Sequence, residues 1–175
     1  MADYSQNAPS PWAASAVKCA AIGKGVASVG AYAFYEHTAL ESVSLPEGLT
    51  SIGNLAFPGC AALKDLRLPE SLTYIGTYAF SECNSLTSVT IPQAVTSLQY
   101  AFFNCASLTE ARVHCQLSLP SYTFPGACKV TRYGTARGVC GKTAGSLTWT
   151  LEESGLLTIR GTGAMKDFYG NDGLP

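Results

Sequence analysis

The sequence predicts a β-rich repeat solenoid followed by a small C-terminal β-hairpin module. Three observations lead to this prediction: a phrase that recurs at a fixed interval, apolar residues two apart inside that phrase, and a tail with another pattern. The phrase begins at Leu40, Leu63, Leu86 and Leu108, so the period is 23, 23 and 22 residues. A fixed period in this range is typical of solenoids, in which each repeat packs mainly on its neighbours.

The first part of each repeat predicts a short strand. It reads Leu40-Glu-Ser-Val43-Ser-Leu45-Pro46 in the first clear copy. Residues two apart lie on the same face of a strand, so the apolar columns point inward and the intervening residues outward. Proline then ends the strand because it cannot donate to a ladder. The apolar columns are Val43, Leu66, Val89, Ala111 and Leu45, Leu68, Ile91, Val113; the prolines are Pro46, Pro69 and Pro92.

The second part of each repeat predicts a turn and a short helical segment. Gly53 and Gly76 each follow an isoleucine, where we expect a positive φ. Phe57, Cys60 and Leu63 then recur at spacings of three, which suits one or two helical turns facing inward. A worn copy runs from Val17 to Leu40 with His37 in the Cys column, and a later one keeps Tyr122-Thr-Phe124, so we expect about five repeats.

These residues resemble the BspA-type leucine-rich repeat family, whose repeat reads L-x-x-V-x-[LI]-P-x-x-[LV]-T-x-I-G-x-x-A-F-x-x-C-x-x-L. The resemblance covers residues 17 to 130, with three near-perfect copies in register. It implies a curved leucine-rich-repeat solenoid with a β-sheet on one face, in a secreted or cell-surface bacterial protein. It also implies adhesion and protein binding rather than catalysis.

The two ends predict halves of another module. Leu147 to Leu151 and Leu157 to Arg160 alternate apolar and polar residues around a turn, which predicts a β-hairpin. Met1, Asp3, Tyr4, Asn7 and Pro11 match Met165, Asp167, Phe168, Asn171 and Pro175 at a constant offset of 164. We therefore expect residues 1–16 to be the tail of a preceding β module, 17–133 the solenoid and 134–175 the start of a second module. The tail resembles the Cys-Gly…Leu-Thr-Trp…Gly-Thr-Gly-Ala-Met segments that alternate with such repeats in large bacterial surface proteins.

Composition excludes several partners. Apolar residues make up 47% of the chain and charged residues 13%, which supports a packed core. A formal charge of −1 gives no footprint for nucleic acid, and no apolar run is long enough to insert into a membrane. The first residues lack the pattern of a signal peptide, so we expect export only as part of a longer protein. Cut modules expose unpaired strand edges, which predicts self-association of Met1–Trp12 with the Leu147–Ile159 hairpin of another chain.

Few residues suggest chemistry. His37 stands in a packing column, and His114 and Cys115 are strand neighbours that we expect to point to opposite faces. The stretch from Ala136 to Thr143 imitates a phosphate loop without its first glycine or a following helix, so it predicts a turn into a strand. We expect Cys60, Cys83 and Cys105 to be buried thiols, leave open one disulfide among Cys115, Cys128 and Cys140, and expect no metal, cofactor or catalytic site.

The outward residues of the strands are the candidate ligand-binding site. They alternate hydroxyl and mixed-charge rows, and solenoids present such faces to partners. The predicted function is therefore a non-catalytic extracellular binding module for a protein or glycan, acting on a host or a matrix surface. The alternative is a structural spacer in a large surface protein, with no ligand of its own. The candidate residues are Ser42, Ser44, Asp65, Arg67, Ser88, Thr90, Glu110 and Arg112.

Overall fold

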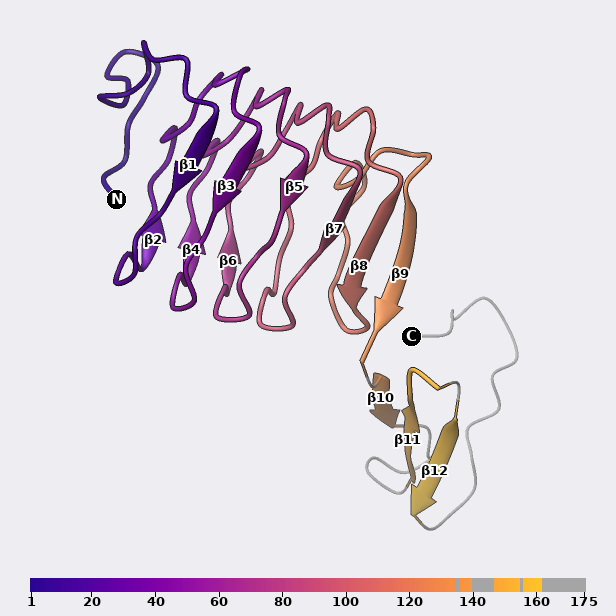
Figure 1. Cartoon of the computed structure of the whole chain (residues 1–175). Helices are drawn as coiled ribbons and strands as arrows, with labels where there is room; N and C mark the ends of the chain where they lie inside the picture. The colour runs from indigo at the N-terminus through magenta and orange to yellow at the C-terminus, as the bar shows by residue number, and fades with distance from the viewer. Residues whose placement is uncertain (135, 140–146, 155, 162–175) are drawn as a thin grey trace. The chain divides into compact units, whose positions relative to one another are not determined.

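The computed structural model describes residues 1–134, 136–139, 147–154 and 156–161 (Figure 1). The chain divides into two compact units, Met1–Thr131, here called the solenoid, and Arg132–Pro175, here called the C-terminal unit. The solenoid is the predicted stack of repeats. Its rungs, numbered 1 to 5, comprise residues 17–39, 40–62, 63–85, 86–107 and 108–128.

The first part of every rung forms the predicted strand, and one further strand, β9, follows rung 5. Strands β1 (Cys19–Ala21), β3 (Ser42–Ser44) and β5 (Asp65–Leu66) make one parallel sheet. Strands β7 (Ser88–Thr90), β8 (Glu110–His114) and β9 (Lys129–Tyr133) make another. Both sheets follow each other along one side of the stack, here called the strand face (Figure 1).

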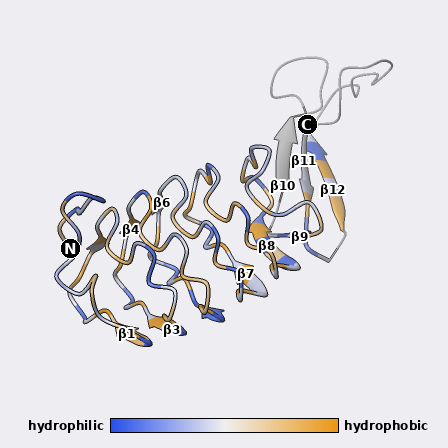
Figure 2. Cartoon of the chain, turned by 90° about the horizontal axis from the view of Figure 1, so that it is seen from above, coloured by the Kyte–Doolittle hydropathy of each residue, from blue (hydrophilic) through white to orange (hydrophobic). Residues whose placement is uncertain are grey.

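A second row of strands closes each of the first three rungs. Strands β2 (Ser28–Val29), β4 (Ser51–Ile52) and β6 (Tyr74–Ile75) pair in parallel and in register. Their inward residues Val29, Ile52 and Ile75 are buried, while the exposed Tyr74 faces outward. Hydrophobic and hydrophilic residues are interspersed along the chain of the solenoid (Figure 2).

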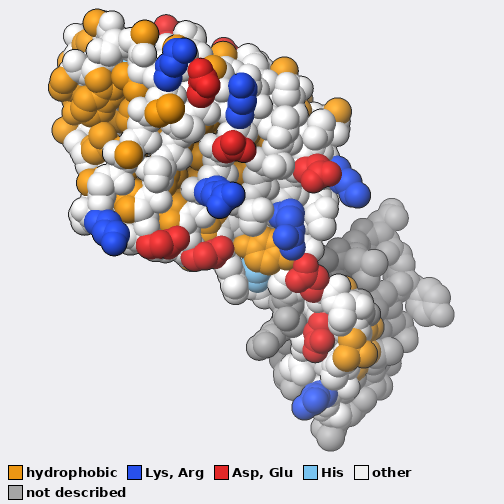
Figure 3. Space-filling view, viewed as in Figure 1, with side chains coloured by type: hydrophobic (Ala, Val, Ile, Leu, Met, Phe, Trp, Pro, Cys, Tyr) orange, Lys and Arg blue, Asp and Glu red, His pale blue; other side chains and the backbone are white. Residues whose placement is uncertain are grey.

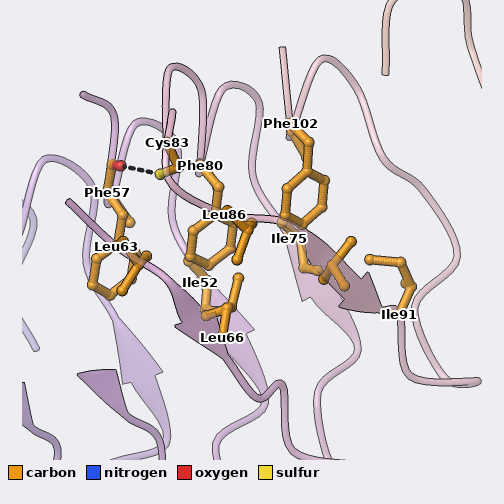
Figure 4. Close-up of a cluster of buried hydrophobic side chains, with 14 of the residues drawn as sticks. Ile52, Phe57, Leu63, Leu66, Ile75, Phe80, Cys83, Leu86, Ile91 and Phe102 are labelled. Atoms are coloured by element: carbon orange, nitrogen blue, oxygen red, sulfur yellow. Dashed lines mark hydrogen bonds between the residues drawn. The ribbon is translucent and has the colours of Figure 1, made fainter. Parts of the chain in front are cut away.

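One stack of aromatic rings runs through the core. Phe57 lies between Phe34 and Phe80 at centroid distances of 4.8 and 5.2 Å, with the rings within 5° of parallel. The stack continues to Phe102 and Phe124 at 5.3 and 5.6 Å. Leucines and isoleucines of the strand columns fill the space beside the rings (Figure 4). The distance between the rings is close to the distance of about 4.8 Å between hydrogen-bonded strands. Ring stacking and strand pairing are therefore compatible with the same separation of the rungs.

The segment after each glycine is a series of turns, and the prediction of helical turns is wrong. No helix occurs among the residues that the structure describes. The backbone N–H of Phe57 donates to the carbonyl of Ala79 in the next rung, at 2.8 Å, instead of to its own segment. Tyr78 and Glu82 adopt positive φ values of 56° and 59°, which break any helix between them. Phe57, Cys60 and Leu63 still point inward, as their spacing predicts, and are fully buried.

Gly53 and Gly76 serve close packing rather than a positive φ. The positive φ occurs two residues later, at Leu55 and Tyr78. A Cβ on Gly76 would lie 2.5 Å from the backbone nitrogen of Asn54, and one on Gly53 would lie 2.6 Å from that of Ala31. Glycine is needed because the preceding rung's backbone occupies the place of a side chain.

The N-terminal segment covers the first rung. The indole Nε1–H of Trp12 donates to the carbonyl of Ala33 at 2.8 Å, and its ring lies 5.6 Å from Phe34. The backbone N–H of Tyr4 donates to the carbonyl of Ala31 at 2.8 Å. These contacts shield the end of the aromatic stack. The expected exchange of Met1–Trp12 with another chain stays a prediction, and it would have to displace them.

The C-terminal unit contains the predicted hairpin with one further strand. Strands β11 (Leu147–Leu151) and β12 (Leu157–Gly161) pair antiparallel, with Trp149 opposite Ile159. Strand β10 (Ala136–Val139) pairs antiparallel with β11 on its other edge. The Met165–Pro175 part of the terminal match lies outside the described residues.

The close approach at the glycine column gives a first prediction. Gly76→Ala is expected to lower the free energy of unfolding by about 2 kcal/mol or more, because backbone atoms must move to admit the methyl group. Urea unfolding followed by circular dichroism measures the change. Gly126→Ala is the matched control, since its Cβ would meet nothing within 4 Å. Equal losses in the two variants would contradict the packing role of Gly76.

Candidate binding face

The outward residues of the strand face are placed as the sequence predicts. Ser44, Asp65, Arg67, Ser88, Thr90, Glu110 and Arg112 are exposed, and Ser42 is half-buried. The inward residues between them are buried, with Val43 and Leu66 both 7% exposed. A rigid core layer therefore holds a row of polar side chains at the surface.

Four of the predicted residues surround one hollow. Ser42 and Ser44 of β3, with Asp65 and Arg67 of the next rung, line a depression of about 350 Å³. Ser42 is paired in register with Asp65, which brings the two rungs together. Leu45, Leu68 and Pro69 contribute apolar surface to the same hollow. An apolar depression with a few charged groups at its edge is the usual form of a binding site.

Glu47 is a lining residue that the sequence did not identify. It follows Pro46, beyond the end of the strand, so its place in the alternation of the strand gives no signal. The structure brings it to the hollow because the chain turns there, at Gly48 with a φ of 97°. The hollow thus carries two carboxylates, Glu47 and Asp65, and one guanidinium, Arg67.

The other four predicted residues lie on the second sheet. Ser88 is opposite Glu110 and Thr90 is opposite Arg112 across the β7–β8 pair. They do not line the hollow of the first sheet. Acidic and basic side chains are interspersed over the strand face (Figure 3). The predicted set is therefore two neighbouring groups on one side of the solenoid.

The charges of the hollow are available to a partner. Within the described part of the chain, neither Asp65 nor Arg67 forms an ion pair. The neighbouring pair Lys18–Glu41 has an N–O distance of 3.9 Å and exposed side chains, so it contributes little to stability. A complementary charged group could pair with Asp65 or Arg67 without first breaking an internal ion pair.

The two histidines lie in different surroundings. His37 is 5% exposed and lies between the carbonyls of Tyr35 and Trp12, at 3.1 and 3.2 Å, which is a packing role. Cys115 follows the end of β8, so it does not point away from His114 as expected; its Sγ lies 3.9 Å from Nε2. The N–H of Gln116 donates to Nδ1 of His114 at 3.4 Å.

The described residues offer neither a metal site nor a membrane segment. No group of three potential metal ligands occurs among them. The described residues also contain no helix of the length and hydropathy required to cross a bilayer. The stretch from Ala136 to Thr143 resembles a phosphate loop in sequence. Its first part, Ala136–Val139, is strand β10, and the remainder lies outside the described residues.

The cysteines of the repeat are buried free thiols, as predicted. The Sγ–H groups of Cys60, Cys83 and Cys105 donate to the carbonyls of Phe34, Phe57 and Phe80 at 3.4, 3.3 and 3.1 Å. Burial raises the pKa of the Cys60 thiol from 9.0 to about 12. Hydrogen bonding with Cys105, together with burial, raises the pKa of Cys83. Cys128 is a free thiol, and Cys140 lies outside the described residues.

The stacked rungs, the strand face and the repeat columns together define a leucine-rich-repeat solenoid. A family model described as the BspA type leucine-rich repeat region matches residues 13–131 in 6 copies. The chain belongs to this family. A comparison with curated protein sequences finds no match.

Solved structures with this fold come from several bacteria. The pneumococcal vaccine antigen PcpA is 30% identical over 67% of this chain, with a TM-score of 0.59. A leucine-rich repeat protein from Bacteroides ovatus is 25% identical over 67%, with a TM-score of 0.51. The T. pallidum protein TpLRR is 29% identical over 64%, with a TM-score of 0.55. The chain spans 31%, 37% and 50% of these three proteins, respectively.

The buried thiols give a second prediction. In the folded protein at about pH 8, an alkylating reagent is expected to modify the exposed Cys19 quickly and Cys60, Cys83 and Cys105 only after unfolding, because the reagent cannot reach buried thiols. At Cys60 and Cys83 the raised pKa also disfavours the reactive thiolate. Peptide mapping by mass spectrometry measures this. Since folding raises the pKa of Cys60, its contribution to stability is complete below pH 9.0 and is lost as the pH rises toward about 12. Equal alkylation of Cys19 and Cys60 in the folded chain would disprove the burial argument.

Proposed function

We propose that the chain is a non-catalytic binding module that recognises a protein or glycan partner on its strand face. The hollow between β3 and the following rung carries the proposal, because it joins Asp65, Arg67 and Glu47 to apolar surface. Arginine is enriched at the energetic centres of interfaces, and its planar group pairs with two acceptors at once. The residues Ser88, Thr90, Glu110 and Arg112 extend the same face on the second sheet.

Display outside the cell belongs to the same proposal. PcpA, which has this fold, is a vaccine antigen of the pneumococcus. Such a role fits a rigid stack that carries mixed charges on one side. The adhesion of a bacterium to host or matrix molecules would then be the biological result of the binding.

A structural spacer is the second candidate. The uniform core of stacked phenylalanines and the regular rungs favour it, since both provide stiffness. The exposed charges of the hollow favour binding instead, because a spacer needs only small polar residues there. The two candidates differ in whether the chain binds a ligand with saturation.

The proposed site gives a third prediction. The full chain is screened on arrays of matrix proteins and glycans, beside Arg67→Ala and the double variant Arg67→Ala/Arg112→Ala. Saturable binding is expected, with affinity about tenfold lower in Arg67→Ala and lower still in the double variant. Lys24→Ala removes an equal charge outside the hollow and is expected to leave binding unchanged. The absence of binding by the unaltered chain would favour the spacer, and equal binding by Arg67→Ala would move the site elsewhere.

A further inference from the structure

The side of the solenoid formed by the turn segments differs from the strand face in charge. The turn face is here the set of residues 30–39, 53–62, 76–85, 99–107 and 121–127. It contains the carboxylates Glu36 and Glu82 and no lysine or arginine. All six lysines and arginines of the solenoid lie outside the turn face: Lys18, Lys24, Lys64, Arg67, Arg112 and Lys129. The turn face is therefore a negative surface.

An aromatic cluster occupies this face over rungs 3 to 5. Tyr78 and Tyr100 stack at a centroid distance of 5.3 Å and an interplanar angle of 14°. Phe103 meets both rings edge to face, at 5.9 and 6.4 Å. Tyr122 stands in the next rung and is 70% exposed, without a ring contact in the described chain. Tyr122 therefore does not continue the stack of Tyr78 and Tyr100.

A hollow of about 400 Å³ is lined by turn residues of rungs 4 and 5. Its lining includes Phe103, Asn104, Tyr122, Phe124 and Pro125. Aromatic rings have a negative face, which attracts a cation placed over it. The hollow thus offers aromatic surface on a face of the solenoid that contains no lysine or arginine.

Glu82 adds a full negative charge beside the cluster. Its backbone N–H donates to the carbonyl of Phe103 at 2.8 Å, which fixes it next to the aromatic residues. Its side chain is exposed and forms no ion pair within the described part of the chain. A cation bound over the rings would therefore find a carboxylate nearby.

The backbone at the tyrosine positions allows a precise test. Leu55, Tyr78, Tyr100 and Tyr122 occupy equivalent places in four rungs, with φ values of 51°, 56°, 54° and 64°. Asparagine tolerates this left-handed conformation better than leucine or tyrosine. A change to asparagine at these positions removes the side chain without straining the backbone further.

We propose that the aromatic cluster of Tyr78, Tyr100, Phe103 and Tyr122, with Glu82, is a second binding site that takes the guanidinium or ammonium group of a basic peptide segment. The complementarity of charge identifies the occupant: ring faces and a free carboxylate on a side of the solenoid without cations. The site is separate from the strand face, because its residues belong to the turns rather than to the strands. It does not depend on the function proposed above.

The test titrates blocked hexa-arginine and hexa-lysine peptides into the full chain and measures dissociation constants by calorimetry, with hexa-glutamine as the uncharged probe. Hexa-arginine is expected to bind most tightly and hexa-glutamine not at all. Tyr122→Asn and Tyr100→Asn are each expected to weaken the binding of hexa-arginine about fivefold, the effect of one cation–π contact. Leu55→Asn makes the same change of residue at the same φ outside the cluster and is expected to have no effect.

A second variant separates the site from general attraction to acidic groups. Glu82→Gln keeps the shape of the side chain and is expected to weaken hexa-arginine binding and reduce its salt dependence. Glu70→Gln, at an exposed carboxylate outside both the turn face and the strand-face hollow, is expected to change neither. Unchanged binding in Tyr122→Asn and Glu82→Gln would overturn the proposal, as would a loss in Glu70→Gln equal to theirs. Tighter binding of a neutral oligosaccharide such as maltohexaose, lost in Tyr122→Asn, would also overturn it and assign the cluster to glycans.

Discussion

The separation of successive rungs is the constraint on which the rest of the solenoid depends. Parallel strands pair at about 4.8 Å, and aromatic rings stack in nearly the same range. The centroid distances from Phe34 to Phe102, between 4.8 and 5.3 Å, show that one spacing satisfies both interactions. Because strands and core agree on this distance, each added rung buries the face of the preceding one without distortion. The N-terminal segment applies the same solution at the first rung, where Trp12 covers Phe34.

This spacing also decides the shape of the turns and what they display. Alternate backbone N–H groups of the turn segments, such as those of Phe57 and Gly59, donate to the next rung, so these groups do not form a helix within their own rung. The backbone of one rung approaches the next so closely at Gly53 and Gly76 that no side chain fits. Two residues later a positive φ directs a larger side chain outward, as at Tyr78. The binding surfaces on the two sides thus have different origins: alternation along strands produces one, and repeated turn geometry produces the other.

Sequence reasoning recovers what depends on periodicity. The column of Val43 and Leu66 is buried and Asp65 and Arg67 are exposed, because a period of two residues fixes the face of a strand. Sequence reasoning does not predict the conformation of the turn segments, because hydrogen bonds to neighbouring rungs determine it. A phenylalanine-cysteine-leucine spacing of three suits helix and tight turns equally, and only the inter-rung hydrogen bonds distinguish them. Glu47 escaped notice because it lies past a proline, and β10 because Ala136–Val139 has little alternation.

The direction of the hydrogen bonds between rungs has an electrostatic consequence. In the turn segments the N–H groups of Phe34, Phe57 and Phe80 donate forward, to the following rung. At the start of the turn segments and before the strands, the N–H groups of Gly53, Gly76 and Lys64 donate backward, to the preceding rung. The peptide dipoles of these opposed rows oppose one another, whereas those of an α-helix add up and charge its ends. The opposed rows therefore partly cancel, so the axial field grows less as the stack lengthens than it would if all the rows pointed one way.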